Sequence, residues 1–338
     1  MLLSIIIPVY QVEEYLKECL DSVLQCEVND CEIILSLGHS KDRSNLIAEE
    51  YETKFKNVHT ITQSNTGLSN ARNCALREAK GEYVLFLDSD DYTISENLNY
   101  IIVQLRDGFF SADVVVTDYY QLICATNQIV EYFQIGKDTP IEYDKMKLLP
   151  KIFRKGESCW TVWRYIYRRD FLEKNQIYFL ENKLAEDMDF TTRVLLANPS
   201  MIFCHCPYYV YRVGRENSLS EGLTLGRFAD SIMVAKNCIE YVKETNLPYK
   251  SLLLARLQRE YVAYLSSLLR VDKKDRKSAI YLCKDWEKAL KDSQSDIVKI
   301  IFASLSILGI PATAYLLYFV KSIRNFIRDN LFKRGASK

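Results

Sequence analysis

The first 90 residues alternate between short apolar runs and amphipathic segments, and this alternation restricts the possible folds more than any other feature. Apolar runs rich in β-branched residues occur at residues 2–9, 32–37, 58–62 and 83–87. Between them, residues 11–24, 44–54 and 68–80 carry apolar side chains at helical spacing. Strands that alternate with helices are joined by right-handed crossovers, so this pattern predicts an α/β fold with a mainly parallel sheet.

The fourth apolar run ends in an acidic cluster. Residues 83–87 pass directly into Asp88, Asp90 and Asp91. A continuous apolar run predicts a strand buried on both faces, and open α/β sheets bind their ligands at the carboxyl ends of such strands. Carboxylates this close repel one another, and Mn²⁺ or Mg²⁺, which prefer oxygen ligands, would relieve that repulsion. An ordinary acidic turn is the alternative.

Composition and missing motifs exclude several classes of protein. Lys and Arg together number 44, as do Asp and Glu. The chain therefore lacks the net positive charge that would indicate nucleic-acid binding. The first strand is not followed by G-x-G-x-x-G, and no P-loop motif occurs. The ten cysteines are scattered, which predicts reduced and mostly buried thiols in a cytosolic environment.

Three motifs in the first hundred residues resemble those of a known family. They are residues 4–10 (SIIIPVY), 67–73 (GLSNARN) and 87–91 (LDSDD). In this order and spacing they are similar to the motifs of family 2 glycosyltransferases, over roughly residues 1–220. The resemblance implies a GT-A fold, in which helices flank a Rossmann-like, mainly parallel sheet. It also implies a bacterial enzyme of the capsular, exopolysaccharide or cell-surface glycan type.

The resemblance also implies roles for residues of these motifs. Pro8 and Tyr10 would bind the nucleotide, with Tyr10 stacked on the base, and Arg72 would contact the nucleotide or its diphosphate. Asp88 and Asp90 would form the D-x-D motif, with Asp90 as the direct ligand of Mn²⁺ or Mg²⁺ and Asp88 near both metal and nucleotide. A bound cation and an Arg would neutralise the charge that develops on the leaving diphosphate. A core aromatic and a surface helix cation are the alternatives for Tyr10 and Arg72.

The chain departs from the family pattern in the loop after the second strand. Family members usually carry two acids and a Gly here, and one acid accepts a hydrogen bond from uracil. Leu37, Gly38 and His39 occupy the matching positions, while Ser40 and Asp42 remain. The resemblance implies a UDP-sugar donor, but this departure leaves the base open.

A second acidic site lies at residues 186 and 187. Apolar side chains at helical spacing from Met188 onward place Glu186 and Asp187 in the first turn of a helix. Helix-dipole capping is one explanation. The resemblance implies instead that Asp187 is the general base, and an adjacent Glu186 would raise its proton affinity.

Three further residues are candidates for contacts with the substrates. Arg212 and Arg215 lie in a segment that resembles the one closing over the donor diphosphate, with surface ion pairs as the alternative. Trp163 lies in a run of aromatic and basic residues near which the family's acceptor enters. The alternative for that run is a twisted strand with Arg stems packed on rings.

The C-terminal third predicts helices without catalytic motifs. Long helices are expected at residues 224–245, 250–270 and 275–291, so that residues 221–295 form a helical extension that packs on the rest or mediates homo-oligomers. Residues 300–320 carry no charge, and basic residues follow them.

Gly309 and Pro311 interrupt this uncharged segment, which favours a pair of helices lying in a membrane interface over one spanning helix. Residues 296–338 are therefore expected to associate with a membrane surface through residues 300–334, the basic ones attracting anionic lipid. A core or oligomerisation helix pair is the alternative.

The predicted function is that of a metal-dependent, inverting glycosyltransferase at the cytoplasmic face of the cell membrane, with a lipid-linked glycan acceptor. A sugar-nucleotide pyrophosphorylase is one alternative, but it would need a Gly-rich, basic loop where residues 8–11 read PVYQ. A catalytically decayed glycan-binding or scaffold subunit is another, favoured by Leu37 and Gly38 in place of acids.

Overall fold

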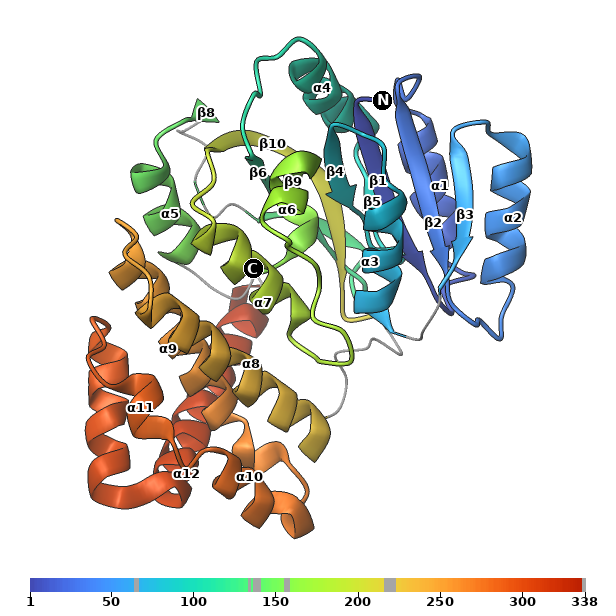
Figure 1. Cartoon of the computed structure of the whole chain (residues 1–338). Coiled ribbons are helices and arrows are strands. Elements are labelled where there is room, and N and C mark those ends of the chain that lie inside the picture. Colours follow the sequence, from blue (N-terminus) through green and yellow to red (C-terminus); the bar gives the residue numbers. More distant parts are fainter. Residues whose placement is uncertain (64–66, 133–134, 136–140, 155–158, 216–222, 336–338) are drawn as a thin grey trace. The chain divides into compact units, whose positions relative to one another are not determined.

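The computed structural model describes residues 1–63, 67–132, 135, 141–154, 159–215 and 223–335 (Figure 1). Its chain divides into two compact units, Met1–Leu219 and Ser220–Lys338. The first unit is an α/β domain and the described part of the second is helical. The predicted α/β architecture with a C-terminal helical region is therefore confirmed.

The first half of the α/β unit follows the predicted alternation. Its elements are β1 (Leu3–Val9), α1 (Leu16–Leu24), β2 (Cys31–Leu37), α2 (Ser44–Lys54), β3 (Val58–Thr62), α3 (Leu68–Glu78) and β4 (Tyr83–Phe86). The strands pair in the order β3-β2-β1-β4, and every pairing among them is parallel. All residues of β1, β2 and β4 are buried, as expected for parallel strands covered on both faces.

The second half extends the same sheet in mixed orientation. Its elements are β5 (Tyr92–Thr93), α4 (Ser95–Arg106), β6 (Val114–Ile123), β7 (Gln128–Tyr132), β8 (Ile141–Glu142), α5 (Lys145–Arg154), the short 3₁₀ helix η2 (Val162–Arg164), β9 (Tyr165–Arg168), α6 (Arg169–Lys174), α7 (Glu186–Leu196) and β10 (Met201–Val213). The sheet continues from β4 through β9, β6 and β10 to β5. Strand β9 is antiparallel to both β4 and β6. It therefore lies between the parallel pair β1–β4 and the parallel pair β6–β10.

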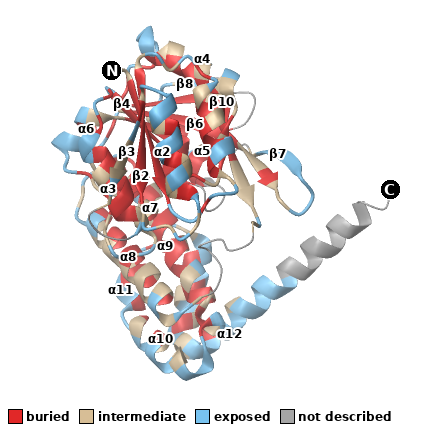
Figure 2. Cartoon of the chain, turned by 90° about the vertical axis from the view of Figure 1, so that its right-hand side faces the viewer, coloured by how far each residue is buried: buried red, intermediate tan, exposed pale blue. Residues whose placement is uncertain are grey.

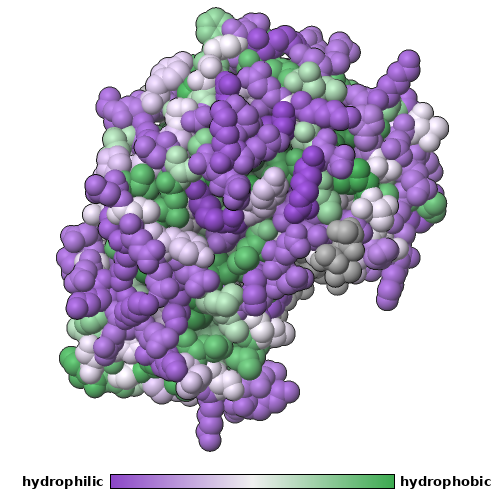
Figure 3. All heavy atoms as spheres, viewed as in Figure 1, coloured by the Kyte–Doolittle hydropathy of each residue, from purple (hydrophilic) through white to green (hydrophobic). Residues whose placement is uncertain are grey.

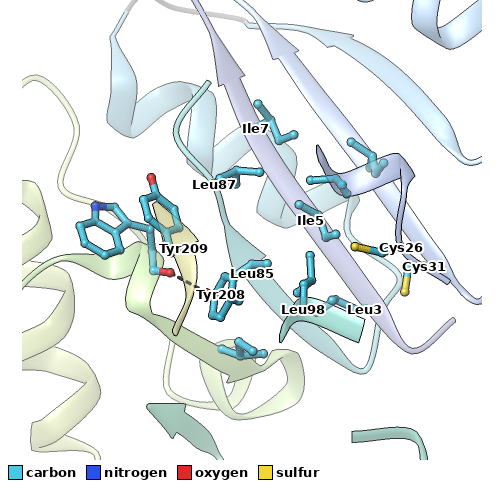
Figure 4. Packing of buried hydrophobic residues seen from close by; sticks show 14 of the residues in the cluster. Leu3, Ile5, Ile7, Cys26, Cys31, Leu85, Leu87, Leu98, Tyr208 and Tyr209 are labelled. Atoms are coloured by element: carbon cyan, nitrogen blue, oxygen red, sulfur yellow. Dashed lines mark hydrogen bonds between the residues drawn. The ribbon is translucent and has the colours of Figure 1, made fainter. Parts of the chain in front are cut away.

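The main hydrophobic core lies between the sheet and helices α1, α2 and α4. Alternate residues Leu3, Ile5 and Ile7 of β1 point to this side and meet Leu85 and Leu98 (Figure 4). Buried residues concentrate in the strands in Figure 2, where the outer faces of the helices are exposed. This two-sided burial fixes the strand ends at which the acidic residues lie.

Helix α1 begins five residues later than the sequence pattern predicts, because the loop before it is held by another loop. The N–H groups of Gln11, Val12 and Glu13 donate to the side chains of Ser40, Ser44 and Asp42, at 3.1, 2.8 and 3.1 Å. Gln11 adopts a φ of 52°, which a helix does not allow. The two loops that follow β1 and β2 are thus bonded together.

The second unit consists of helices in its described part. They are α8 (Leu225–Lys243), α9 (Lys250–Ser266), the 3₁₀ turns η3 (Leu268–Arg270) and η4 (Lys273–Asp275), α10 (Arg276–Leu282), α11 (Trp286–Leu290) and α12 (Asp296–Gly335). The helix predicted at residues 275–291 is two short helices, since the backbone turns between Leu282 and Trp286.

Candidate functional site

The acids that follow β4 are paired with arginines from distant segments. Asp88 Oδ1 accepts a hydrogen bond from Arg72 Nη2 at 2.7 Å, and Asp90 Oδ2 accepts one from Arg215 Nε at 2.6 Å. About a quarter of each acidic side chain is exposed, 24% for Asp88 and 26% for Asp90. The repulsion predicted for this cluster is therefore offset by cations of the protein itself.

Asp91 is turned inward and serves as an anchor. It is buried, and its carboxylate accepts hydrogen bonds from the Tyr209 hydroxyl at 2.6 Å and from the Arg212 N–H at 2.8 Å. Burial raises the pKa of Asp91 well above its usual range, and the charges of Asp90 and Asp88 raise it further. This contact ties the acidic loop to β10.

Arg72 joins the two acidic regions of the sequence. Its side chain is 1% exposed, and its Nη1 lies 2.8 Å from Asp187 Oδ1 and 3.5 Å from Glu186 Oε1, while Nη2 binds Asp88. Its guanidinium lies over the Phe179 ring at 5.1 Å. Burial alone would lower the pKa of Arg72, but Asp187 and Asp88 raise it, so the group stays charged. The buried Arg72 guanidinium therefore contacts carboxylates both from the loop after β4 and from the start of α7.

Glu186 and Asp187 begin helix α7, as the sequence predicts. The residue before them, Ala185, has φ 63° and ψ 28°, a left-handed conformation that costs a non-glycine residue about 1–2 kcal/mol. Burial raises the pKa of Asp187 to about 7; Arg72 opposes this shift, and Glu186 and Asp88 add to it. Burial also raises the pKa of Glu186. Asp187 thus has the proton affinity expected of a general base near neutral pH.

A cluster of buried aromatic rings packs next to Arg72. Phe179 stacks on Phe190 of α7 with ring centroids 4.2 Å apart and meets Phe86 of β4 edge-on at 5.1 Å. Asn73, next to Arg72 on α3, accepts a hydrogen bond from Phe179 N–H at 2.7 Å and donates to its carbonyl at 2.9 Å. These contacts fix the start of α7 against α3.

Arg212 and Arg215 lie beside Asp90 at the end of β10. Arg212 Nε donates to the Asp90 carbonyl at 2.8 Å, and its Nη2 pairs with Glu18 at 2.6 Å. Both guanidinium groups lie over the Tyr15 ring, at 5.3 and 5.5 Å. They are 10% and 14% exposed, so each presents an edge to solvent next to the acids.

Tyr10 projects from the end of β1 and is 51% exposed. A Cβ placed on Gly38 would lie 3.0 Å from Tyr10 Cδ2, so the glycine makes room for this ring. Pro8 is buried within β1 opposite Ser36. The two strand ends thus offer an open aromatic face beside a loop that lacks the expected acids.

Trp163 lies behind the acidic loop. It is 3% exposed, and its ring stacks on Tyr209 at 4.1 Å and on Tyr211 at 5.5 Å. Its carbonyl accepts the Tyr208 hydroxyl at 2.7 Å, the dashed bond in Figure 4. In this position the indole supports the tyrosine that binds Asp91.

The residues at the acidic loop suit a hard divalent cation only together with ligands from a substrate. Within the described residues, no group of three or more His, Cys, Asp or Glu is arranged to hold a metal ion. Asp90 and Asp88 nevertheless offer partly exposed carboxylate oxygens. Mg²⁺ is commonly bound by one or two carboxylates and substrate phosphates, and this donor set fits that pattern.

Sequence reasoning did not single out three residues that organise the site. Tyr209 holds Asp91, Asn73 holds the Phe179 segment, and Glu18 holds Arg212. Their partners lie more than 100 residues away in sequence. Asn73 ends the 67–73 motif, but the motif does not reveal its partner, and no local pattern distinguishes Tyr209 and Glu18 from ordinary core or surface positions.

Residues 4–213 match the protein family described as Glycosyl transferase family 2. EpsJ of Bacillus subtilis, named as an uncharacterized glycosyltransferase, is 30% identical over 266 residues, covering 78% of this chain and 69% of EpsJ. Glycosyltransferase GlyA of Streptococcus pneumoniae is 31% identical over 224 residues, covering 64% of this chain and 31% of GlyA.

Among solved structures, the fold is similar to that of S. aureus TarS. The TarS 1–349 crystal structure in complex with UDP-GlcNAc has a TM-score of 0.75 and 22% sequence identity, and the match covers 96% of this chain and 92% of that one. This likeness confirms the predicted GT-A-like fold with its C-terminal helices.

Proposed function

The chain belongs to glycosyltransferase family 2, and from that premise we propose that it moves one sugar from a nucleotide-sugar to a hydroxyl of a lipid-linked surface glycan. The observation that carries the proposal is the convergence of Asp88, Asp187 and Glu186 on Arg72. It brings the acids after β4 and the acids of α7 into one site.

The donor nucleotide would bind at the ends of β1 and β2. The exposed Tyr10 ring offers a face on which a base can stack, and Gly38 leaves that ring its space. The TarS complexes with UDP-GlcNAc and UDP favour a uridine nucleotide. The absence of acids at positions 37 and 38 means that a uracil base would be recognised through other groups.

The diphosphate would lie beside the acidic loop. Asp90, with Asp88, would hold Mn²⁺ or Mg²⁺, which would supply positive charge to the leaving diphosphate. Arg215 and Arg212, whose edges are exposed next to Asp90, would bind phosphate oxygens. Arg72, 1% exposed, would act by positioning Asp88 and Asp187 instead of touching the diphosphate.

Asp187 would act as the general base. Its carboxylate takes the proton of the acceptor hydroxyl while the acceptor oxygen bonds to the anomeric carbon. The bond from that carbon to the diphosphate oxygen breaks, the nucleoside diphosphate leaves with the electron pair, and the anomeric configuration inverts. The raised pKa of Asp187, about 7, suits this transfer. Trp163 would support the acceptor side indirectly, through Tyr209.

The chain's relatives and its apolar C-terminal helix support a proposed acceptor and location. We place the enzyme at the cytoplasmic face of the membrane, where a capsular or exopolysaccharide intermediate on a lipid carrier would be extended. Among the described residues, one helix, at residues 296–323, is by length and composition long and apolar enough to cross a membrane. Residues 221–295 would form a helical extension, with a homo-oligomer as one possible role.

A donor-hydrolysis screen tests the proposal. The wild-type protein with Mn²⁺ is incubated with a panel of UDP-, GDP- and dTDP-sugars, and release of the nucleoside diphosphate is measured. We expect one donor class to be turned over. Asp187→Asn should lower transfer at least ~10²-fold, the range for losing a general base. Asp170→Asn is the control, because Asp170 is 51% exposed on α6 and pairs with Lys174 at 3.5 Å.

Three results would overturn this function. Transfer by Asp187→Asn at the wild-type rate would show that Asp187 is not the general base. Failure of every nucleotide to bind in calorimetry with Mn²⁺ would favour a scaffold subunit, whereas release of nucleoside triphosphate from a sugar nucleotide and pyrophosphate would favour a pyrophosphorylase.

A further inference from the structure

Helix α12 is divided by a sharp break. At Gly309 the backbone has φ 74° and ψ 175°, a conformation accessible essentially only to glycine. The hydroxyls of Ser304 and Thr313 lie 3.0 Å apart across it. Residues nine apart in a straight helix are separated by about 13.5 Å along the axis, so the two arms turn back toward each other. The segment is therefore a helical hairpin, with arms at residues 296–308 and 310–335.

The first arm carries apolar side chains both on its buried face and on its exposed face. One face is packed into the C-terminal unit through Val298, Ile301 and Leu305, all buried. The opposite face exposes Ile297 at 60%, Ile300 at 67% and Ile307 at 80%. A surface helix ordinarily presents polar residues there, so this face is suited to an apolar environment.

The second arm becomes exposed on all sides soon after the break. Thr313 and Ala314 are buried and Leu317 is half-buried, but six large apolar side chains beyond residue 314 are exposed by 44–64%. They are Tyr315, Leu316, Tyr318, Phe319, Val320 and Ile323. Three of them are consecutive, at residues 318–320, so they point in different directions around the helix. Hydrophobic residues also interrupt the hydrophilic surface of the C-terminal unit in Figure 3.

Charge along this segment has one sign. After Asp296 the sequence contains seven Lys or Arg residues and a single Asp, although the whole chain has equal numbers of acids and bases. Lys299 and Lys321 are exposed within the described part of the segment; the side chains after residue 323 lie outside it. Such a segment attracts an anionic surface and repels a second copy of itself.

We infer that this hairpin is a monotopic anchor that inserts into one leaflet of a bilayer containing anionic phospholipid. The first arm, residues 296–308, is about 20 Å long, and the uncharged part of the second arm, residues 310–320, is about 16 Å long; both are shorter than the ~30 Å hydrocarbon core. The first arm is also covered by protein on one face, so it cannot be surrounded by lipid. Ile307, Tyr315 and Phe319 would reach the acyl chains, and Lys321 would meet headgroups.

The inference rests on the proposed function only for the lipid-linked acceptor that the enzyme would meet at this surface. The expected binding of the hairpin to lipid does not depend on the proposed function. Binding of vesicles and hydrolysis of the donor are separate measurements, so failure of one is distinguishable from failure of the other.

Vesicle flotation of the full chain tests the anchor. One set of vesicles is phosphatidylcholine alone, and the other contains added phosphatidylglycerol. We expect the wild type to float with the anionic vesicles, less so in high salt, and the Ile307→Glu/Phe319→Glu variant to lose at least ~10-fold in partitioning. Phe109→Glu is the matched control: Phe109 is 65% exposed in the other unit, and this variant should float like the wild type.

Each remaining outcome contradicts the inference. Flotation of the double variant with wild-type efficiency would show that α12 is not the anchor, and equal flotation with both vesicle types would remove the anionic requirement. If the wild type stays unbound but forms dimers in light scattering, and the double variant does not, the exposed face of α12 binds a second copy of the chain.

A protease experiment separates a monotopic anchor from a spanning helix. Protease added outside the vesicles should remove a C-terminal tag completely, whereas protection of the tag would indicate a spanning helix.

Discussion

Arg72 is the residue that most clearly separates what sequence and structure reveal. The G-x-S-x-A-R-N pattern identifies it as functional, and the resemblance implies contact with the nucleotide. The structure places its guanidinium against Asp88 and Asp187, with 1% of the side chain exposed. Helical periodicity cannot predict this burial, because a charged residue on a helix is ordinarily solvent-exposed.

Removing the Arg72 charge is expected to destabilise the fold. Arg72→Met leaves three carboxylates without their shared cation, and losing one partner of a buried ion pair typically costs about 3–5 kcal/mol. Arg72→Lys should recover part of that loss. The control is Arg77→Met on the same helix, where Arg77 is 52% exposed and should change the free energy of unfolding by less than about 0.5 kcal/mol. Equal urea midpoints for Arg72→Met and Arg77→Met would contradict the bridging role.

The pKa of Asp187 predicts how transfer depends on pH. A general base works only when deprotonated, so with a pKa of about 7 the rate should rise as pH increases through 7 and then level off. Glu186 contributes to that raised pKa, so Glu186→Gln should move the rising limb to lower pH. Asp170→Asn should leave the limb in place. A limb that stays fixed or moves upward in Glu186→Gln would exclude this electrostatic coupling.

At the scale of elements, the strands were predictable and their loops were not. Apolar runs located β1, β2, β3 and β4 within a few residues, because strands buried on both faces contain little else. The late start of α1 depends on hydrogen bonds that residues 11–13 donate to Ser40, Asp42 and Ser44, which lie in the next loop and at the start of α2. Such contacts between separate segments leave no periodic signal.

The ends of β1 and β2 give a prediction for nucleotide binding. Gly38→Ala would place a Cβ 3.0 Å from Tyr10 Cδ2, too close for the ring to stay in place. The ring can shift because Tyr10 is 51% exposed. We expect affinity for the nucleoside diphosphate to fall ~10-fold, equivalent to about 1.4 kcal/mol, with little change in stability. Gly226→Ala is the control, since its Cβ would meet only one atom, at 3.9 Å. Unchanged affinity, measured by calorimetry, would argue against Tyr10 as the base platform.

The end of β10 gives a prediction for the metal. Arg215 forms a 2.6 Å ion pair with Asp90, and a divalent cation would compete with Arg215 for the Asp90 carboxylate. Arg215→Ala should therefore bind Mn²⁺ more tightly than the wild type in the absence of nucleotide, yet bind the nucleoside diphosphate more weakly. Arg77→Ala, at a position on α3 that is 52% exposed, should resemble the wild type in both titrations. Identical Mn²⁺ affinity of Arg215→Ala and wild type would place the metal elsewhere.

At the scale of the whole molecule, the alternation of elements and the three motifs predicted the fold class and the family, and both are confirmed. The mixed half of the sheet was less predictable, because β9 enters antiparallel between β4 and β6 from a segment of aromatic and basic residues. The convergence of residues 88 and 187 depends on this long-range arrangement, which sequence spacing alone does not encode.

The central claim is that the acids after β4 and at the start of α7 perform different tasks in one active site. The most direct test measures binding of the nucleoside diphosphate with Mn²⁺ and turnover of the donor in the same preparations. We predict that Asp187→Asn binds within about twofold of the wild type while turnover falls at least ~10²-fold, and that Asp90→Asn loses both. Wild-type turnover in Asp187→Asn, or undiminished binding in Asp90→Asn, would contradict it.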